Sequence, residues 1–126
     1  MLYSKHSSRK PAEVEQRLRD AAQRHKFGIL HVLDLKDTLH QKGIELGPEC
    51  RVYDVCNPDA ARQALTEHMG ASAVLPCRIS IFGEEGGSTL VTVKPTDLLR
   101  ATGLTGTEAL AEQVEREVLA IIDEAA

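Results

Sequence analysis

The fold is decided by residues 77–94, which read CRISIFGEEGGSTLVTVK. Two runs rich in apolar and β-branched residues, 77–82 and 90–94, flank a loop of residues 83–87 that contains three glycines. Because glycine tolerates the positive φ angles that a hairpin loop needs, the stretch predicts two antiparallel strands. A tight hairpin is incompatible with a purely parallel, doubly wound sheet. The stretch therefore predicts an α+β protein.

Strands and helices alternate along the rest of the chain. The predicted strands are residues 2–7, 29–35, 51–55, 77–82 and 90–94. The predicted helices begin at Pro11, Lys36 and Pro58, and they are followed by a helical turn near 97–101 and a final helix of about 105–124. The order β-α-β-α-β-α-β-β-α-α predicts a mainly antiparallel sheet with helices packed on it. A length of 126 residues suits one domain with a real core, so residues 1–126 are expected to form a single domain.

Capping residues mark two of the helix starts. Asn57 and Pro58 are the residue types preferred at the N-cap and at the first helical position. Thr105 and Glu108 have the spacing of a capping box and predict the start of the last helix. We expect Met69 to lie on the inner edge of the helix that begins at Pro58.

The segment 29–35 has apolar residues at most positions, which predicts a strand buried on both faces. His31, between apolar neighbours, is then expected to be a hydrogen-bonded core histidine. A short echo links residues 25–28 (HKFG) and 68–70 (HMG), each of which ends a helix ahead of an apolar stretch. The echo hints at a weak βαβ duplication.

The composition disfavours several classes of function. A net charge of −4 and an aromatic content of 3% argue against nucleic acid, which requires a basic surface or stacking rings. No apolar run is long enough to span a membrane and no signal sequence is recognisable, so we expect neither membrane insertion nor export. Three cysteines, an odd number, indicate free thiols and a cytoplasmic location. No P-loop, Rossmann glycine pattern, nucleophile elbow or zinc spacing is present, so no cofactor and no metal is expected.

The two ends of the chain carry opposite charge. Residues 1–26 contain seven Lys or Arg against three acids, whereas residues 107–126 contain six acids against Arg116 alone. One interpretation is that the basic first helix meets an acidic partner. The other, which we favour, is two solvated helix faces that are neighbours in the fold.

Two short motifs stand out, residues 55–58 (VCNP) and residues 75–79 (LPCRI), with a Gly-hydrophobic-Asp segment at 28–35 (GILHVLDL) upstream. Over roughly residues 1–100 these strings resemble the family described as domain of unknown function 302. The resemblance implies a mainly antiparallel sheet with helices packed on it, commonly as a homodimer. It implies no activity, and the helix at about 105–124 lies beyond it as an extra element.

The motifs contain two thiols. Cys56 lies just before a helix start, where the partial positive charge of the helix favours a thiolate, although Asn57 and Pro58 leave few N–H donors for it. Cys77 alternates with Ile79, as expected for a buried strand face. If their strands are neighbours, Cys56 and Cys77 approach each other and form a redox or sulfur-handling pair. The alternative is that both are small core thiols.

Our first hypothesis is a homodimeric module that binds or senses a small molecule without catalysis. Its ligand is small and either apolar or anionic. Arg78 is either an anion-binding charge or a solvated residue on the other face of its strand. Five residues are candidates for the binding site: Asn57, Pro58, Pro76, Arg78 and His31.

Two other hypotheses belong to different classes. The second is a thiol protein that carries sulfur or senses oxidants through Cys56, with Cys77 as the resolving partner. The third is a purely structural or interaction domain, in which the two motifs serve only as a strand-to-helix junction and a strand start. No catalytic group stands out apart from the thiols, which favours a protein that is not an enzyme.

Overall fold

The structure is a computed structural model that describes residues 1–126. Its five strands are β1 (Leu2–Ser7), β2 (Gly28–Asp34), β3 (Cys50–Cys56), β4 (Cys77–Glu84) and β5 (Gly87–Val93). Its helices are α1 (Pro11–Arg24), α2 (Leu35–Gln41), α3 (Pro58–Glu67), α4 (Pro95–Thr102) and α5 (Glu108–Ala125), with a 3₁₀ helix η1 (Met69–Val74). The strands form one sheet in the order β1-β5-β4-β3-β2, and every neighbouring pair is antiparallel. The predicted α+β fold is confirmed.

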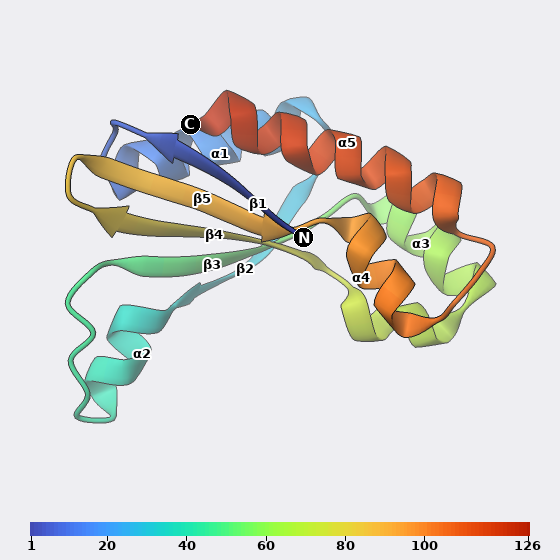
Figure 1. Ribbon diagram of the computed structural model, residues 1–126, viewed down its shortest axis with the longest axis horizontal. Helices are drawn as coiled ribbons and strands as arrows, with labels where there is room; N and C mark the ends of the chain where they lie inside the picture. The colour runs from blue at the N-terminus through green and yellow to red at the C-terminus, as the bar shows by residue number, and fades with distance from the viewer.

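The helices are distributed unevenly around the sheet (Figure 1). α1 and α5 lie side by side over one face, while α2 projects on the other side of the sheet. α3, η1 and α4 gather at one end, close to the first half of α5. The sheet thus has a covered face, an open face and a helical cap at one end.

The hairpin is tighter than the sequence predicts. Glu84 pairs with Gly87, so the loop contains only Glu85 and Gly86 instead of residues 83–87. Gly86 has a φ of +86° and Gly87 a φ of +146°, both of which favour glycine. A Cβ on Gly87 would lie 2.0 Å from the carbonyl oxygen of Ser7. Glycine is required there because the end of β1 crosses the turn.

The main core lies between the sheet and the pair α1 and α5. Leu18 on α1 and Ile121 on α5 are fully buried there, against Ile79 and Ile81 of β4. The apolar positions of α1 recur at helical spacing, as do those in the second half of α5. The buried helix residues of this core are Val14, Leu18, Ala21, Ala22, Val118, Ile121, Ile122 and Ala125.

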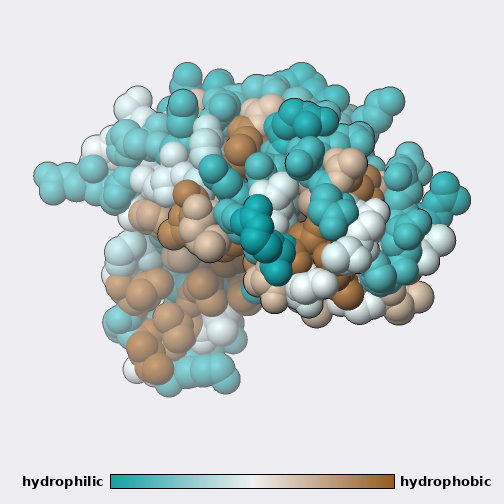
Figure 2. Space-filling model, turned by 45° about the vertical axis from the view of Figure 1, so that its right-hand side comes forward, coloured by the Kyte–Doolittle hydropathy of each residue, from teal (hydrophilic) through white to brown (hydrophobic).

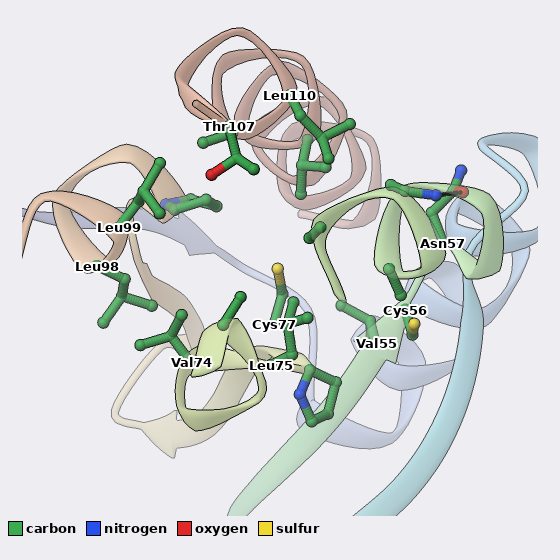
Figure 3. A pocket seen from close by; sticks show the side chains of 18 of the residues that line it. Val55, Cys56, Asn57, Val74, Leu75, Cys77, Leu98, Leu99, Thr107 and Leu110 are labelled. Atoms are coloured by element: carbon green, nitrogen blue, oxygen red, sulfur yellow. Dashed lines mark hydrogen bonds between the residues drawn. The ribbon is translucent and has the colours of Figure 1, made fainter. Parts of the chain in front are cut away.

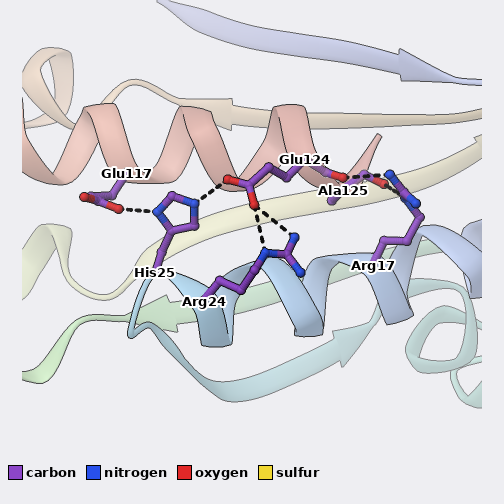
Figure 4. Close-up of polar contacts among 6 residues, drawn as sticks. All are labelled: Arg17, Arg24, His25, Glu117, Glu124 and Ala125. Carbon is purple, nitrogen blue, oxygen red and sulfur yellow. Dashed lines mark hydrogen bonds and ion pairs between the residues drawn. The ribbon is translucent and has the colours of Figure 1, made fainter.

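The oppositely charged ends of the chain meet along α1 and α5 (Figure 4). Both ring nitrogens of His25 face carboxylates, Nδ1 that of Glu117 and Nε2 that of Glu124. Arg24 donates to Glu124 Oε1 at 2.9 and 3.1 Å. Arg17 donates to the last carbonyls of α5 at 2.9 and 3.1 Å, where a cation is favourable. The basic residues of α1 and its end therefore pair with acceptors on the neighbouring helix α5.

Two predictions about β2 are wrong. β2 is an edge strand with a bulge between Ile29 and His31, and none of its residues is buried. The His31 side chain is 62% exposed, so it is a surface histidine instead of a core one. The apolar run reads as a buried strand, but sequence periodicity does not reveal whether a second strand covers its outer edge.

Three smaller predictions also differ from the structure. The N-cap of α5 is Thr107, with no side-chain cap, and Glu108 accepts instead from the N–H of Gly106, so Thr105 forms no capping box. Met69 begins η1 and is 73% exposed. The hint of a duplication is not confirmed: α1 connects the two edge strands, whereas α3 and η1 connect the adjacent antiparallel strands β3 and β4.

Candidate functional site

An apolar cavity of about 80 Å³ lies where the helical cap meets the end of the sheet (Figure 3). Fifteen of its nineteen lining residues are hydrophobic, and none is charged. Most of them remain partly accessible to solvent, so the cavity is close to the surface. The lining residues are Phe27, Val55, Cys56, Asn57, Ala60, Ala61, Ala64, Ala71, Val74, Leu75, Pro76, Cys77, Pro95, Leu98, Leu99, Thr107, Leu110, Ala111 and Val114.

The two sequence motifs form the sheet side of this cavity. Asn57 Oδ1 accepts a hydrogen bond of 3.0 Å from the N–H of Ala60, which confirms the predicted N-cap and turns the chain from β3 into α3. Pro58 occupies the first helical position, as predicted, and does not line the cavity. Pro76 follows a cis peptide bond and leads from η1 into β4. The motifs are therefore the two points where β3 and β4 connect to the helical cap.

The helical side of the cavity is built from small and apolar side chains. α3 contributes Ala60, Ala61 and Ala64, whose short side chains leave space between this helix and the sheet end. Leu98 and Leu99 of α4 close the opposite wall. The first half of α5 completes the lining, whereas its second half belongs to the main core.

Cys77 contributes its side chain to the cavity. It is directly opposite Val55 in the β3–β4 register, and both residues face the covered side of the sheet. Figure 3 shows its sulfur pointing into the space between the helices. Burial raises the pKa of the Cys77 thiol to about 11, so the thiol is protonated and uncharged at neutral pH.

Cys56 also borders the cavity, but its side chain lies on the other face of the sheet. Since side chains alternate along a strand, the residue after Val55 points away from Cys77, and Figure 3 shows the two sulfurs directed apart. Burial raises the pKa of Cys56, which is opposite to the lowering expected from the α3 N-terminus. Both thiols are free. β3 and β4 are neighbours, as a pair of Cys56 and Cys77 would require, but their register keeps the two thiols on opposite faces.

Arg78 and His31 meet on the open face instead of in the cavity. Arg78 Nε lies 3.3 Å from Asp54 Oδ1, and His31 Nδ1 lies 3.7 Å from Asp54 Oδ2. Arg78 and His31 are largely exposed, and their shared carboxylate is mostly buried. Of the five candidate ligand residues, the structure brings only Asn57 and Pro76 to the cavity.

The lining contains one hydroxyl, that of Thr107. Thr107 as a residue is only 6% exposed, and its hydroxyl does not cap α5. Because no buried side-chain oxygen of the protein lacks a partner, this free oxygen keeps some accessible surface. Its Oγ1 points from the start of α5 toward the space beside α4 (Figure 3). The cavity therefore combines an apolar lining, a neutral thiol and one free hydroxyl.

Sequence reasoning missed η1, the leucines of α4 and Thr107 as parts of this site. The alanines on one side of α3 indicate that this side of the helix leaves space for a cavity. Their pattern does not identify the elements that form the other wall. No group of three His, Cys, Asp or Glu side chains is arranged to hold a metal ion. None of the helices combines the length and apolar character that a membrane crossing requires.

Comparisons with known proteins agree with this architecture. The family model described as "Domain of unknown function DUF302" matches residues 3–125, a span that extends through α5 and beyond the motifs of residues 1–100. A crystal structure of an uncharacterized conserved DUF302 protein from Bacillus stearothermophilus has a TM-score of 0.94 and 25% sequence identity. That match covers 99% of this chain and 98% of the other. No curated protein matches the chain.

Proposed function

Because the chain belongs to the DUF302 family, whose description assigns no activity, we propose a function from its own geometry: it is a homodimeric module that binds a small, uncharged, mostly apolar molecule in the cavity beside Cys77. The observation that carries the proposal is an apolar cavity with a free threonine hydroxyl in its lining, at the point where both motifs of the chain converge. Small-molecule sites are typically concave and apolar with a few placed polar groups.

The charge of the lining determines the charge of the ligand. No charged side chain lines the cavity, and the thiol of Cys77 is neutral because burial raises its pKa to about 11. An anion would lose its hydration without gaining a compensating partner, which is costly. Arg78, the cation that an anionic ligand requires, is bound to Asp54 on the open face. The structure thus favours the apolar alternative over the anionic one.

The homodimer is supported by the open face of the sheet. Helices α1 and α5 cover only the other face, so most apolar side chains on this one are only partly buried, and Leu2 is 63% exposed. α2 buries none of its residues, and the loop after it exposes Ile44 by 53% and Leu46 by 40%. Figure 2 shows apolar side chains gathered on the projecting lobe that contains α2. The open-face apolar residues of the strands are Leu2, Leu33, Val52, Phe82, Val91 and Val93.

A second copy of the chain fits this surface better than a highly charged partner. The open-face charges already neutralise one another, since Asp54 faces both Arg78 and His31. Two such faces approach without net repulsion. Because α2 projects on the same side as the open face, a two-fold arrangement lets the lobe of each copy cover apolar surface on the other.

The thiol hypothesis has less support. A sulfur carrier or oxidant sensor needs a thiolate, whereas burial raises the pKa of both Cys56 and Cys77. A resolving partner must also reach the reactive sulfur, and these two side chains project to opposite faces. A purely structural domain, the third hypothesis, predicts that the cavity binds nothing.

The ligand proposal is tested by titrating n-pentane into protein with labelled methyl groups and following the NMR shifts of the cavity residues. We expect saturable shifts in the wild type. Ala64→Leu places a larger side chain in the cavity and should abolish them. The matched control is Ala101→Leu, the same change at an exposed position of α4, which should bind like the wild type. Shifts that do not saturate, or that survive Ala64→Leu, would contradict the proposal.

The dimer is tested by sedimentation equilibrium of the wild type and Val91→Lys. Val91 lies in the middle of the open face, where a buried charge disrupts an apolar interface. We expect a dimer for the wild type and a monomer for this variant. Gln113→Lys adds the same charge at an exposed position of α5 and should remain dimeric. A monomeric wild type would remove the dimer from the proposal without affecting the cavity.

A further inference from the structure

We infer that the cavity ligand is a short-chain neutral molecule with a single hydrogen-bonding group, such as an alcohol or a ketone, and that Thr107 binds that group through its hydroxyl. The inference rests on the proposed function, because it names the class of molecule that the cavity holds. It follows from the position of Thr107, the composition of the remaining lining and the size of the space.

Thr107 is the N-cap of α5, a position at which a threonine hydroxyl normally bonds to the backbone of its own helix. At a helix N-cap, the hydroxyl usually accepts a hydrogen bond from a backbone N–H in the first turn. Here no such bond forms, and the carboxylate of Glu108 instead accepts from the N–H of Gly106. The residue is only 6% exposed, but no buried side-chain oxygen of the protein lacks a partner, so the free hydroxyl keeps accessible surface. It can therefore donate to or accept from a molecule in the cavity. The cavity is the space that this hydroxyl faces.

The rest of the lining restricts the ligand to one polar group. Asn57 uses its side-chain oxygen to cap α3, and Figure 3 shows its amide turned away from the centre of the cavity. Cys77 offers only a protonated thiol, which is a weak hydrogen-bonding group. A ligand with a second strongly polar group, or with a charge, would bury that group without a partner. A hydroxyl or a carbonyl suits Thr107, because a threonine hydroxyl both donates and accepts.

The size of the cavity limits the length of the ligand. Its volume of about 80 Å³ is roughly half that of the engineered cavity of about 150 Å³ that binds benzene. By that comparison, roughly three non-hydrogen atoms fit inside. A slightly longer chain can extend toward the surface, because most of the lining remains partly accessible to solvent. The ligand is then a short chain or a small branched molecule, and its hydrocarbon part contacts the leucines of α4 and the alanines of α3.

The inference is tested by comparing n-butanol with n-pentane, which have the same number of non-hydrogen atoms, on wild-type protein and on Thr107→Val. The substitution preserves the shape of the side chain, and it removes no helix cap because the hydroxyl forms none. We expect n-butanol to bind more tightly than n-pentane to the wild type. Thr107→Val should weaken n-butanol roughly fivefold, the effect of one neutral hydrogen bond, and leave n-pentane unchanged or slightly tighter. Propionate, which has the same number of non-hydrogen atoms but carries a charge, should not bind.

Two further variants keep the test decisive. Thr107→Ser restores the hydroxyl and should recover most of the affinity for n-butanol. Thr105→Val makes the same substitution two residues earlier, outside the cavity lining, and should have no effect. If n-butanol and n-pentane both bind but neither responds to Thr107→Val, the inference is overturned while the proposed function stands. If neither probe binds the wild type, the proposed function fails as well.

Discussion

Val55 of β3 lies directly opposite Cys77 of β4 in the antiparallel sheet. This pairing places both side chains on the covered face and directs Cys56 to the open one. A single register therefore determines which side chains of the motifs point into the cavity. It also separates the two thiols that the sequence suggests as a pair.

The register predicts that Cys56 and Cys77 do not form a disulfide within one chain. A disulfide requires the Cβ atoms of the two residues to approach each other, and here they project to opposite faces. After mild oxidation of the native protein, peptide mapping under non-reducing conditions should find no Cys56–Cys77 crosslink. A crosslinked peptide in good yield would show that the strands pair in another register.

Cys56 and Cys77 should alkylate slowly in the native state. Burial raises the pKa of Cys56, so less of it is thiolate at neutral pH than in a free cysteine. With a pKa of about 11 and a buried side chain, Cys77 should react more slowly still until the protein unfolds. Pulsed labelling with iodoacetamide, followed by mass spectrometry, measures both rates against a cysteine-containing peptide. Faster labelling of Cys56 than of the peptide would revive the thiol hypothesis.

Asn57→Ala should destabilise the protein by about 1 kcal/mol, the usual cost of losing an N-cap. The side chain makes one hydrogen bond, to the N–H of Ala60, and nothing else in the structure depends on it. Denaturant unfolding measures the loss, and Asn57→Ser, which keeps a capping oxygen, should recover most of it. A much larger loss would mean that Asn57 has a role beyond the cap.

His25 should make the stability of the protein dependent on pH. Hydrogen bonds to Glu124 and Glu117 raise its pKa above the ordinary value of 6.5, against the opposing effect of burial. A histidine with a raised folded pKa stabilises the fold fully below its unfolded pKa, and this stabilisation is lost as the pH rises through the folded pKa. His25→Gln should therefore cost about 1 kcal/mol at pH 6 and less at pH 9.

The prediction for His25 is checked by urea unfolding of the wild type and His25→Gln across this pH range. Glu117→Gln leaves one of the two carboxylates in place and should show a smaller change of the same sign. A difference between wild type and His25→Gln that grows from pH 6 to pH 9 would contradict the assigned ion pairs.

Local signals in the sequence predict much of the fold. The glycine-rich hairpin fixes the antiparallel pairing, and Asn57 with Pro58 marks a helix start that the structure confirms. These features depend on backbone preferences of adjacent residues, which a sequence shows directly. The family resemblance pointed to the same sheet with packed helices, and the family match confirms the membership.

The site was harder to predict because it depends on which distant segments meet. The apolar run at β2 reads as a buried strand, yet β2 lies at the sheet edge and leaves His31 in solvent. Thr107 carries no signal of its own, since its role depends on α5 starting opposite α4 beside the start of β4. The alternation of Cys77 with Ile79 predicts a buried strand residue, but the space beside Cys77 arises only from the packing of α3 and η1.

The most direct test of the cavity as a ligand site is to measure nuclear Overhauser effects between bound n-butanol and the methyl groups of the protein. We predict contacts to Val74, Leu98 and Leu99, which line the cavity, and none to Val91 on the open face. Contacts to Val91, or none to the three cavity residues at saturating n-butanol, would contradict the account.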